Sequence, residues 1–82
     1  MKTILYFGAE WCSSCKALKP IVDAEAPQKG YMVDYIDLDT EQGSIDAEDY
    51  KVRSLPTLIV LDEEGAEIRR ASGSTAWQEV QK

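Results

Sequence analysis

The pattern of apolar positions divides the chain into short alternating strands and helices. Residues 2–7 are mostly apolar, β-branched or aromatic, which is typical of a strand covered on both faces. The next segment has helical spacing, with Cys15, Leu18 and Val22 on one apolar face. Pro20 falls inside this helix and predicts a kink, because it cannot donate a backbone hydrogen bond.

The rest of the chain shows weaker patterns. Further strands are predicted over residues 31–38, 57–61 and 66–71. Residues 42–44 predict a turn, with Ser44 as the N-cap of a short helix over residues 45–52. Residues 75–78, Thr-Ala-Trp-Gln, have the form of a capping box and predict a final short helix.

The order of elements, β-α-β-α-β-β-α, predicts an α/β fold. The first two strands are joined through a helix and should be parallel, with a right-handed crossover. The last two strands form an antiparallel hairpin across a turn at residues 62–65. We therefore expect a four-stranded mixed sheet with helices on both faces, as a single domain over residues 1–82.

Composition narrows the function classes. The chain has 82 residues, 44% of them hydrophobic, which is enough for a core. Its net charge of -6 gives no electrostatic basis for binding nucleic acid or an anionic membrane. The acid is concentrated over residues 34–50, which read as a solvated surface or as a docking surface for a basic partner.

The start of the chain affects the expected location. No segment approaches the roughly 18 apolar residues that a membrane span needs. Residues 1–7 read as a strand, without the long apolar region or cleavage site of a signal peptide. We therefore expect a cytoplasmic protein, in a compartment where disulfides are usually transient and catalytic.

Both cysteines of the chain lie in the stretch "AEWCSSCK" at residues 9–16. The apolar helix face includes only Cys15, which should be buried, whereas Cys12 falls at the strand-to-helix junction, where α/β sheets place their sites. Unpaired N–H groups at a helix start stabilise a thiolate, so the pKa of Cys12 should fall below its free value. We expect Cys12 to attack a substrate disulfide and Cys15 to resolve the mixed disulfide, leaving Cys12–Cys15 oxidised.

Two other uses of the cysteines fit the sequence less well. A zinc site needs four ligands, and a chain without histidine would require carboxylates or a second copy to complete it. A structural disulfide across so short a loop constrains the unfolded chain little. Redox chemistry without a metal is therefore the preferred interpretation.

The motif, with a tryptophan before its first cysteine and a lysine after its second, resembles the active site of thioredoxins. Residues 54–58, Ser-Leu-Pro-Thr-Leu, resemble the cis-proline loop of that family, and Gly73 resembles the glycine that follows its hairpin. The extra N-terminal strand and helix of ordinary thioredoxins are missing from the match. The resemblance implies a minimal thioredoxin fold, similar to small thioredoxin-like proteins of phages and archaea.

The resemblance also assigns residue roles. Cys12 matches the nucleophile and Cys15 the resolving cysteine. The implied substrate-binding residues are Trp11, Leu55, Pro56 and Gly73, with Pro56 in the cis form. The implied redox-tuning residues are Ser13, Ser14, Lys16 and Tyr6.

The chain departs from thioredoxins at two of these places. Tyr6 stands where thioredoxins carry a buried aspartate that helps to take the proton of the resolving cysteine. Proton transfer at Cys15 must then use water or another carboxylate. Ser13 and Ser14 replace the usual Gly-Pro pair, so the loop is less rigid. Because this pair tunes the redox potential in the family, the resemblance does not fix the potential of this protein.

The resemblance implies a thiol–disulfide oxidoreductase that reduces protein disulfides and needs no bound cofactor. Its electrons would come from NADPH through a flavin-dependent protein similar to thioredoxin reductase. Implied substrates are disulfide-containing proteins such as a ribonucleotide reductase. The protein itself is expected to be a monomer in the cytoplasm, or in the host cytoplasm if a phage encodes it.

Two alternatives remain. The first is a glutaredoxin-like, glutathione-dependent reductase, although Trp11 argues against it and residues 72–75 lack the acidic pair of a glutathione site. The second is a non-catalytic binding module of thioredoxin fold, in which residues 34–50 contact the partner.

Overall fold

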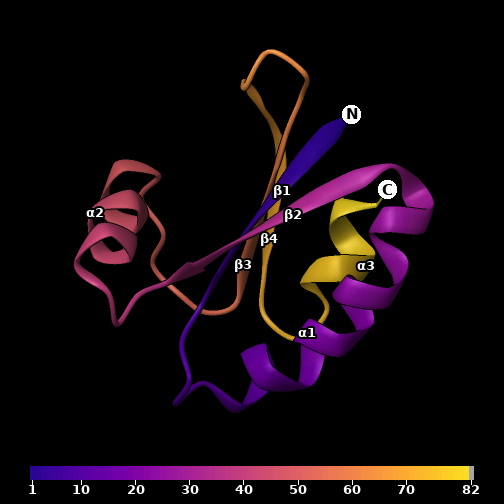
Figure 1. The fold of residues 1–82 in the computed structure, drawn as a ribbon. Helices are drawn as coiled ribbons and strands as arrows, with labels where there is room; N and C mark the ends of the chain where they lie inside the picture. Colours follow the sequence, from indigo (N-terminus) through magenta and orange to yellow (C-terminus); the bar gives the residue numbers. More distant parts are fainter. Residues whose placement is uncertain (82) are drawn as a thin grey trace.

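The computed structural model describes residues 1–81, which form a central sheet with helices on both faces (Figure 1). The elements in chain order are β1 (Lys2–Gly8), α1 (Ser13–Glu25), the 3₁₀ helix η1 (Pro27–Lys29), β2 (Tyr31–Asp37), α2 (Glu41–Asp49), β3 (Thr57–Leu61), β4 (Glu67–Ser72) and α3 (Ala76–Val80). This order confirms the predicted α/β class and the predicted sequence of strands and helices.

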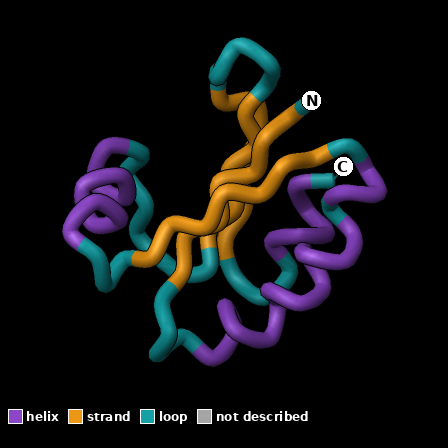
Figure 2. Tube along the Cα trace, viewed as in Figure 1, coloured by secondary structure: helices purple, strands orange, loops and turns teal. Residues whose placement is uncertain are grey.

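The sheet has the strand order β2-β1-β3-β4. Strand β1 pairs in parallel with β2, from Lys2 opposite Tyr31 to Gly8 opposite Asp37. It pairs antiparallel with β3, and β3 pairs antiparallel with β4. Figure 2 shows these strands as one layer, with α1 and α3 together on one side and α2 on the other. The mixed four-stranded sheet is therefore confirmed.

Two apolar cores flank the sheet, because successive side chains of β1 point to opposite faces. The larger core lies under α1 and α3 and includes Ile4 and Tyr6 of β1. The smaller core lies under α2 and includes Leu5 and Phe7. This double burial explains the unbroken apolar run at the start of the chain.

Helix α2 begins earlier than the sequence pattern predicted. The expected turn at residues 42–44 and the N-cap at Ser44 are wrong. Thr40 is the N-cap, and its Oγ1 accepts a hydrogen bond of 3.0 Å from the backbone N–H of Gly43. A Cβ at Gly43 would lie 1.8 Å from the carbonyl oxygen of Asp37. This glycine therefore permits a close backbone approach inside a helix and does not form a turn.

The predicted capping box at the start of α3 is also wrong. Thr75 is the N-cap residue, but its side chain makes no hydrogen bond to the helix backbone. Its Oγ1 instead donates to Oε2 of Glu79 at 2.9 Å. The five-residue helix is held by the burial of Ala76, Trp77 and Val80.

The helices of this fold are short. The longest, α1, has 13 residues and continues through Pro20 to Glu25. Within residues 1–81, no helix has both the length and the apolar character needed to cross a membrane.

Candidate active site

Cys12 and Cys15 form a disulfide at the N-terminal end of α1, with their Cα atoms 5.3 Å apart. Cys12 is the N-cap residue of this helix and has extended backbone angles (φ -92°, ψ 106°). Its Sγ accepts a hydrogen bond of 3.3 Å from the backbone N–H of Cys15. The sulfur therefore occupies the position in which capping side chains receive the free N–H groups of a helix.

Both cysteines are buried, although the helical pattern placed only Cys15 in the core. Cys15 is 4% exposed and Cys12 is 8% exposed, and both belong to the larger core. The pattern missed Cys12 because it precedes the first turn of α1 and is covered by parts of the chain far away in sequence. The two sulfurs therefore differ in what they face and not in their degree of burial.

The two serines between the cysteines are not equivalent. The hydroxyl of Ser14 lies 3.7 Å from Sγ of Cys12, within the range of a weak hydrogen bond to sulfur. Ser13 and Lys16 are exposed residues of the first turns of α1. Of these three predicted redox-tuning residues, Ser14 is therefore the one that contacts the disulfide.

A cleft of about 260 Å³ lies beside Cys12. We call it the Cys12 cleft, and its lining residues are Trp11, Cys12, Leu38, Val52, Arg53, Ser54 and Leu55. Three residues that the sequence singled out, Trp11, Cys12 and Leu55, thus meet at one place. Arg53 and Val52 also line it, and the sequence pattern had not marked them.

Pro56 adjoins the Cys12 cleft through Leu55, and the peptide bond between these two residues is cis. The backbone N–H of Gly73 donates to the carbonyl of Pro56 at 2.9 Å. Gly73 has a φ of 94°, a conformation that favours glycine. The predicted residues Pro56 and Gly73 are therefore hydrogen-bonded to each other, and Pro56 directly follows Leu55 of the Cys12 cleft.

Trp11 projects into solvent beside the disulfide and is 69% exposed. Its indole Nε1–H donates to Oδ1 of Asp39 at 3.0 Å. In the sequence, Asp39 stood out only as one member of the acidic stretch. Because these two residues are 28 positions apart, no local pattern could have indicated this hydrogen bond.

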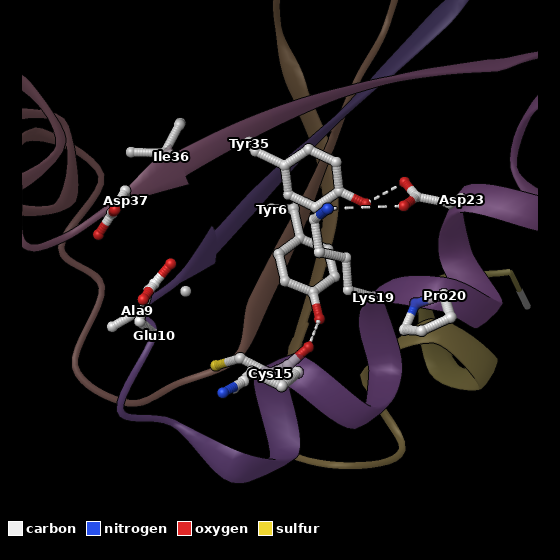
Figure 3. Close-up of a pocket in the computed structure, with 12 residues that line it drawn as sticks. Tyr6, Ala9, Glu10, Cys15, Lys19, Pro20, Asp23, Tyr35, Ile36 and Asp37 are labelled. Atoms are coloured by element: carbon white, nitrogen blue, oxygen red, sulfur yellow. Dashed lines mark hydrogen bonds and ion pairs between the residues drawn. The ribbon is translucent and has the colours of Figure 1, made fainter.

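A second and larger cleft, of about 490 Å³, lies beside Cys15 (Figure 3). We call it the Cys15 cleft, and its lining residues are Tyr6, Gly8, Ala9, Glu10, Cys15, Lys16, Lys19, Pro20, Asp23, Tyr35, Ile36 and Asp37. Cys12 does not line it, just as Cys15 does not line the Cys12 cleft. Each sulfur-bearing residue therefore has a cleft of its own.

Tyr6 reaches the first turn of α1 from the central strand. Its hydroxyl donates a hydrogen bond of 2.6 Å to the backbone carbonyl of Cys15. Burial, with a smaller contribution from the charge of Asp23, raises the pKa of Tyr6 to about 12. The side chain therefore stays neutral near pH 7 and holds the backbone of Cys15 in place.

The far end of the Cys15 cleft is closed by a polar group that the sequence did not indicate. The hydroxyl of Tyr35 donates to Oδ1 of Asp23. Nζ of Lys19 lies 3.7 Å from Oδ2 of Asp23 and 4.6 Å above the ring of Tyr35. Burial first, and then the hydrogen bond and charge of Asp23, raise the pKa of Tyr35. Both oxygens of Asp23 are therefore engaged.

Metal ligands are not gathered at this site. Among the described residues 1–81, no group of three or more His, Cys, Asp or Glu side chains is placed to hold a metal ion. The redox-active group is the disulfide of the chain itself.

Comparison with known proteins agrees with this fold and site. The thioredoxin family model matches residues 1–82. A thioredoxin of Chlamydia trachomatis is 37% identical over 70 residues, which cover 85% of this chain and 67% of the relative. The solved structure of a mutant thioredoxin from Halobacterium salinarum has a TM-score of 0.83 at 30% identity, covering 98% of this chain and 68% of that one. Thioredoxin 1 of Thermosipho africanus has a TM-score of 0.81 at 31% identity, covering 95% and 84%. This chain belongs to the thioredoxin family.

The match extends over part of the relatives only. The chain spans 62–67% of the length of three curated thioredoxins with which it shares 36–40% identity.

Proposed function

We propose that this protein is a thiol–disulfide oxidoreductase that reduces protein disulfides through Cys12 and Cys15. The observation that carries the proposal is the Cys12–Cys15 disulfide at the N-terminus of α1, with Cys12 lining a cleft next to Leu55 and Pro56. Membership of the thioredoxin family supports the same activity.

In the proposed reaction the reduced protein carries two thiols. The Cys12 thiolate attacks one sulfur of a substrate disulfide, forms a mixed disulfide and releases the other substrate sulfur as a thiolate. Cys15 then loses its proton and attacks Sγ of Cys12, which releases the second substrate thiolate. Two electrons pass to the substrate, and the Cys12–Cys15 disulfide remains.

The helix start favours the first of these steps. The backbone N–H of Cys15 points at Sγ of Cys12 at 3.3 Å, and the hydroxyl of Ser14 lies nearby. Hydrogen bonds and the positive end of the helix dipole stabilise an anion at this position. Cys12 is therefore the residue proposed as nucleophile, and the helix supplies its activation.

Substrate binding is proposed at the Cys12 cleft. Leu55 and Trp11 line this cleft, Pro56 follows Leu55, and Gly73 is hydrogen-bonded to Pro56. Because proline lacks an N–H, the backbone beside Pro56 is free to pair with an extended substrate segment. A substrate would then approach from the side of Trp11, away from the Cys15 cleft.

The proposed partners follow from the family. A flavin-dependent protein similar to thioredoxin reductase would return electrons from NADPH to the disulfide. Disulfide-containing proteins, of which a ribonucleotide reductase is one, would receive them. A cytoplasmic monomer remains the proposed form of this protein.

Reduction of insulin disulfides by dithiothreitol, followed by turbidity, tests the activity. The wild-type protein should accelerate it, and Cys12→Ser should return the rate to that of dithiothreitol alone. In a separate incubation with insulin after dithiothreitol has been removed, pre-reduced Cys15→Ser should accumulate a mixed disulfide that non-reducing electrophoresis resolves. Ser13→Ala, at an exposed neighbour, is the matched control and should retain activity. A wild-type protein without acceleration, or a Cys15→Ser protein that never traps insulin, would overturn the proposal.

A further inference from the structure

The resolving step needs a proton acceptor for Cys15, and the structure limits where it can be. During this step the substrate is bonded to Cys12 and occupies the Cys12 cleft. Cys15 lines the other cleft, which stays open to solvent. The hydroxyl of Tyr6 donates a hydrogen bond to the Cys15 carbonyl and, with a pKa raised to about 12, is a neutral phenol that does not take the proton of the thiol. The acceptor must therefore be reached through the Cys15 cleft.

Three carboxylates line this cleft, and they are not equally placed. Both oxygens of Asp23 are engaged, one by Tyr35 and the other by Lys19. Figure 3 shows the sulfur of Cys15 pointing toward the end of the cleft that carries Glu10 and Asp37, away from Asp23. The choice therefore lies between Glu10 and Asp37.

Strand register places Asp37 on the Cys15 side of the sheet. Asp37 pairs with Gly8, as Tyr35 pairs with Tyr6 two residues earlier. Because paired positions of neighbouring strands share a face, Asp37 points to the side that carries α1, as Tyr6 and Tyr35 do.

Gly8 lies between Asp37 and Sγ of Cys15, and its lack of a side chain leaves space there. A Cβ at Gly8 would lie 3.4 Å from Sγ of Cys15. Neighbouring strands are about 4.8 Å apart, so the Asp37 side chain begins about 5 Å from that same point. Sγ of Cys15 and the Asp37 side chain therefore both border the space beside Gly8, and a bridging water molecule would lie there.

Asp37 is also fixed in position. Its Oδ1 accepts a hydrogen bond of 2.8 Å from the backbone N–H of Asp39. The second carboxylate oxygen is left for the cleft. Both carboxylates are exposed, but Asp37 belongs to β2, whereas Glu10 extends from the loop that follows β1.

We propose that Asp37 accepts the proton of Cys15 through a water molecule in the Cys15 cleft during resolution of the mixed disulfide. This inference rests on the proposed function. The proton moves from Sγ of Cys15 to the water and from the water to Asp37. The Cys15 thiolate then bonds to Sγ of Cys12, and the Cys12–substrate bond breaks with its electron pair on the substrate sulfur. Solvent afterwards takes the proton from Asp37.

A stopped-flow reaction with equimolar 5,5′-dithiobis(2-nitrobenzoate) separates the two steps. The attack by Cys12 releases one coloured thiolate, and resolution by Cys15 releases the second. Asp37→Asn keeps the Oδ1 acceptor for the Asp39 N–H and removes only the basic oxygen. We expect an unchanged first phase and a second phase slowed by about tenfold, below the 10²–10⁴ typical of a directly bonded base.

Chemical rescue distinguishes a proton acceptor from a structural role. In Asp37→Asn the second phase should accelerate as acetate or imidazole is added, because a small base can enter the cleft and replace the carboxylate. The wild-type protein should respond much less. Glu10→Gln and Asp23→Asn are matched controls, and each should leave the second phase within about twofold of wild type.

Several results would overturn the inference. One is an unchanged second phase in Asp37→Asn, and another is a slow second phase that added base does not accelerate. A loss in Glu10→Gln that matches or exceeds the loss in Asp37→Asn would assign the role to Glu10. A wild-type protein without any first phase would overturn the proposed function as well. If the first phase is normal, any of the results above overturns only the role proposed for Asp37.

Discussion

Replacing Gly43 with alanine should have two opposite effects on stability, a gain in helix propensity and a loss from a steric clash. Gly43 lies in the first turn of α2, where alanine is normally favoured by about 1 kcal/mol. However, the new Cβ would lie 1.8 Å from the carbonyl oxygen of Asp37 and 2.8 Å from Oγ1 of Thr40. Ordinary carbon–oxygen contacts are about 3.3 Å or longer, so the start of α2 must move by more than about 1 Å.

The cost follows from what this movement breaks. Losing the Thr40 cap costs about 1 kcal/mol, and a forced shift of packed backbone costs about 1–3 kcal/mol. After the gain in propensity, we expect a net destabilisation of about 2 kcal/mol. In a chain of this size, 1 kcal/mol corresponds to about 4–8 °C, so Tm should fall by about 8–16 °C.

Thermal unfolding followed by circular dichroism measures this difference directly. Ser44→Ala is the matched control, because Ser44 is the next residue of the same turn and is exposed. Its Tm should stay the same or rise by a few degrees, since only propensity changes. A Tm for Gly43→Ala equal to or above that of the wild type would refute the close approach and support the turn that the sequence suggested.

Three further predictions concern Tyr6 and Asp39. Tyr6→Phe removes the hydrogen bond to the Cys15 carbonyl and should cost about 1 kcal/mol in urea unfolding, whereas Tyr35→Phe at a more exposed hydroxyl should cost less. Because the folded pKa of Tyr6 is about 12, above its ordinary value of 10, its contribution to stability is complete below pH 10 and is lost between pH 10 and 12. The urea midpoint should therefore fall between pH 10 and 12, and it should fall less in Tyr6→Phe than in the wild type. An equal fall of the midpoint with pH in both proteins would contradict this. Asp39→Ala releases the indole of Trp11 and should lower kcat/KM for insulin by about two- to tenfold. Its free energy of unfolding should stay within about 0.5 kcal/mol of the wild type, and Glu48→Ala is the control that should not change kcat/KM.

The sequence predicted the sheet well because its signals are local and strong. The apolar runs at residues 2–7 and 57–61 correspond closely to β1 and β3, and the helix face of Cys15, Leu18 and Val22 is buried as expected. The paired cysteines also follow directly from their spacing.

The errors arose where specific contacts of a residue override its local preference. Gly43 suggested a turn, but it is required by the backbone of Asp37 six residues earlier. Thr75 has the composition of a cap, yet its hydroxyl bonds to a side chain one turn later. The burial of Cys12 and the bond from Trp11 to Asp39 depend on loops brought together only by the fold. Such contacts leave no periodic trace in the sequence.

The separation of the two clefts has a consequence for inhibition. A compound that occupies the Cys12 cleft meets the same residues as the substrate and competes with it. A compound seated in the Cys15 cleft would leave that surface free. It would lower the maximal turnover without raising the substrate concentration needed for half of it, and excess substrate would not displace it. The two halves of the redox couple are therefore separate pharmacological targets within one turn of a helix.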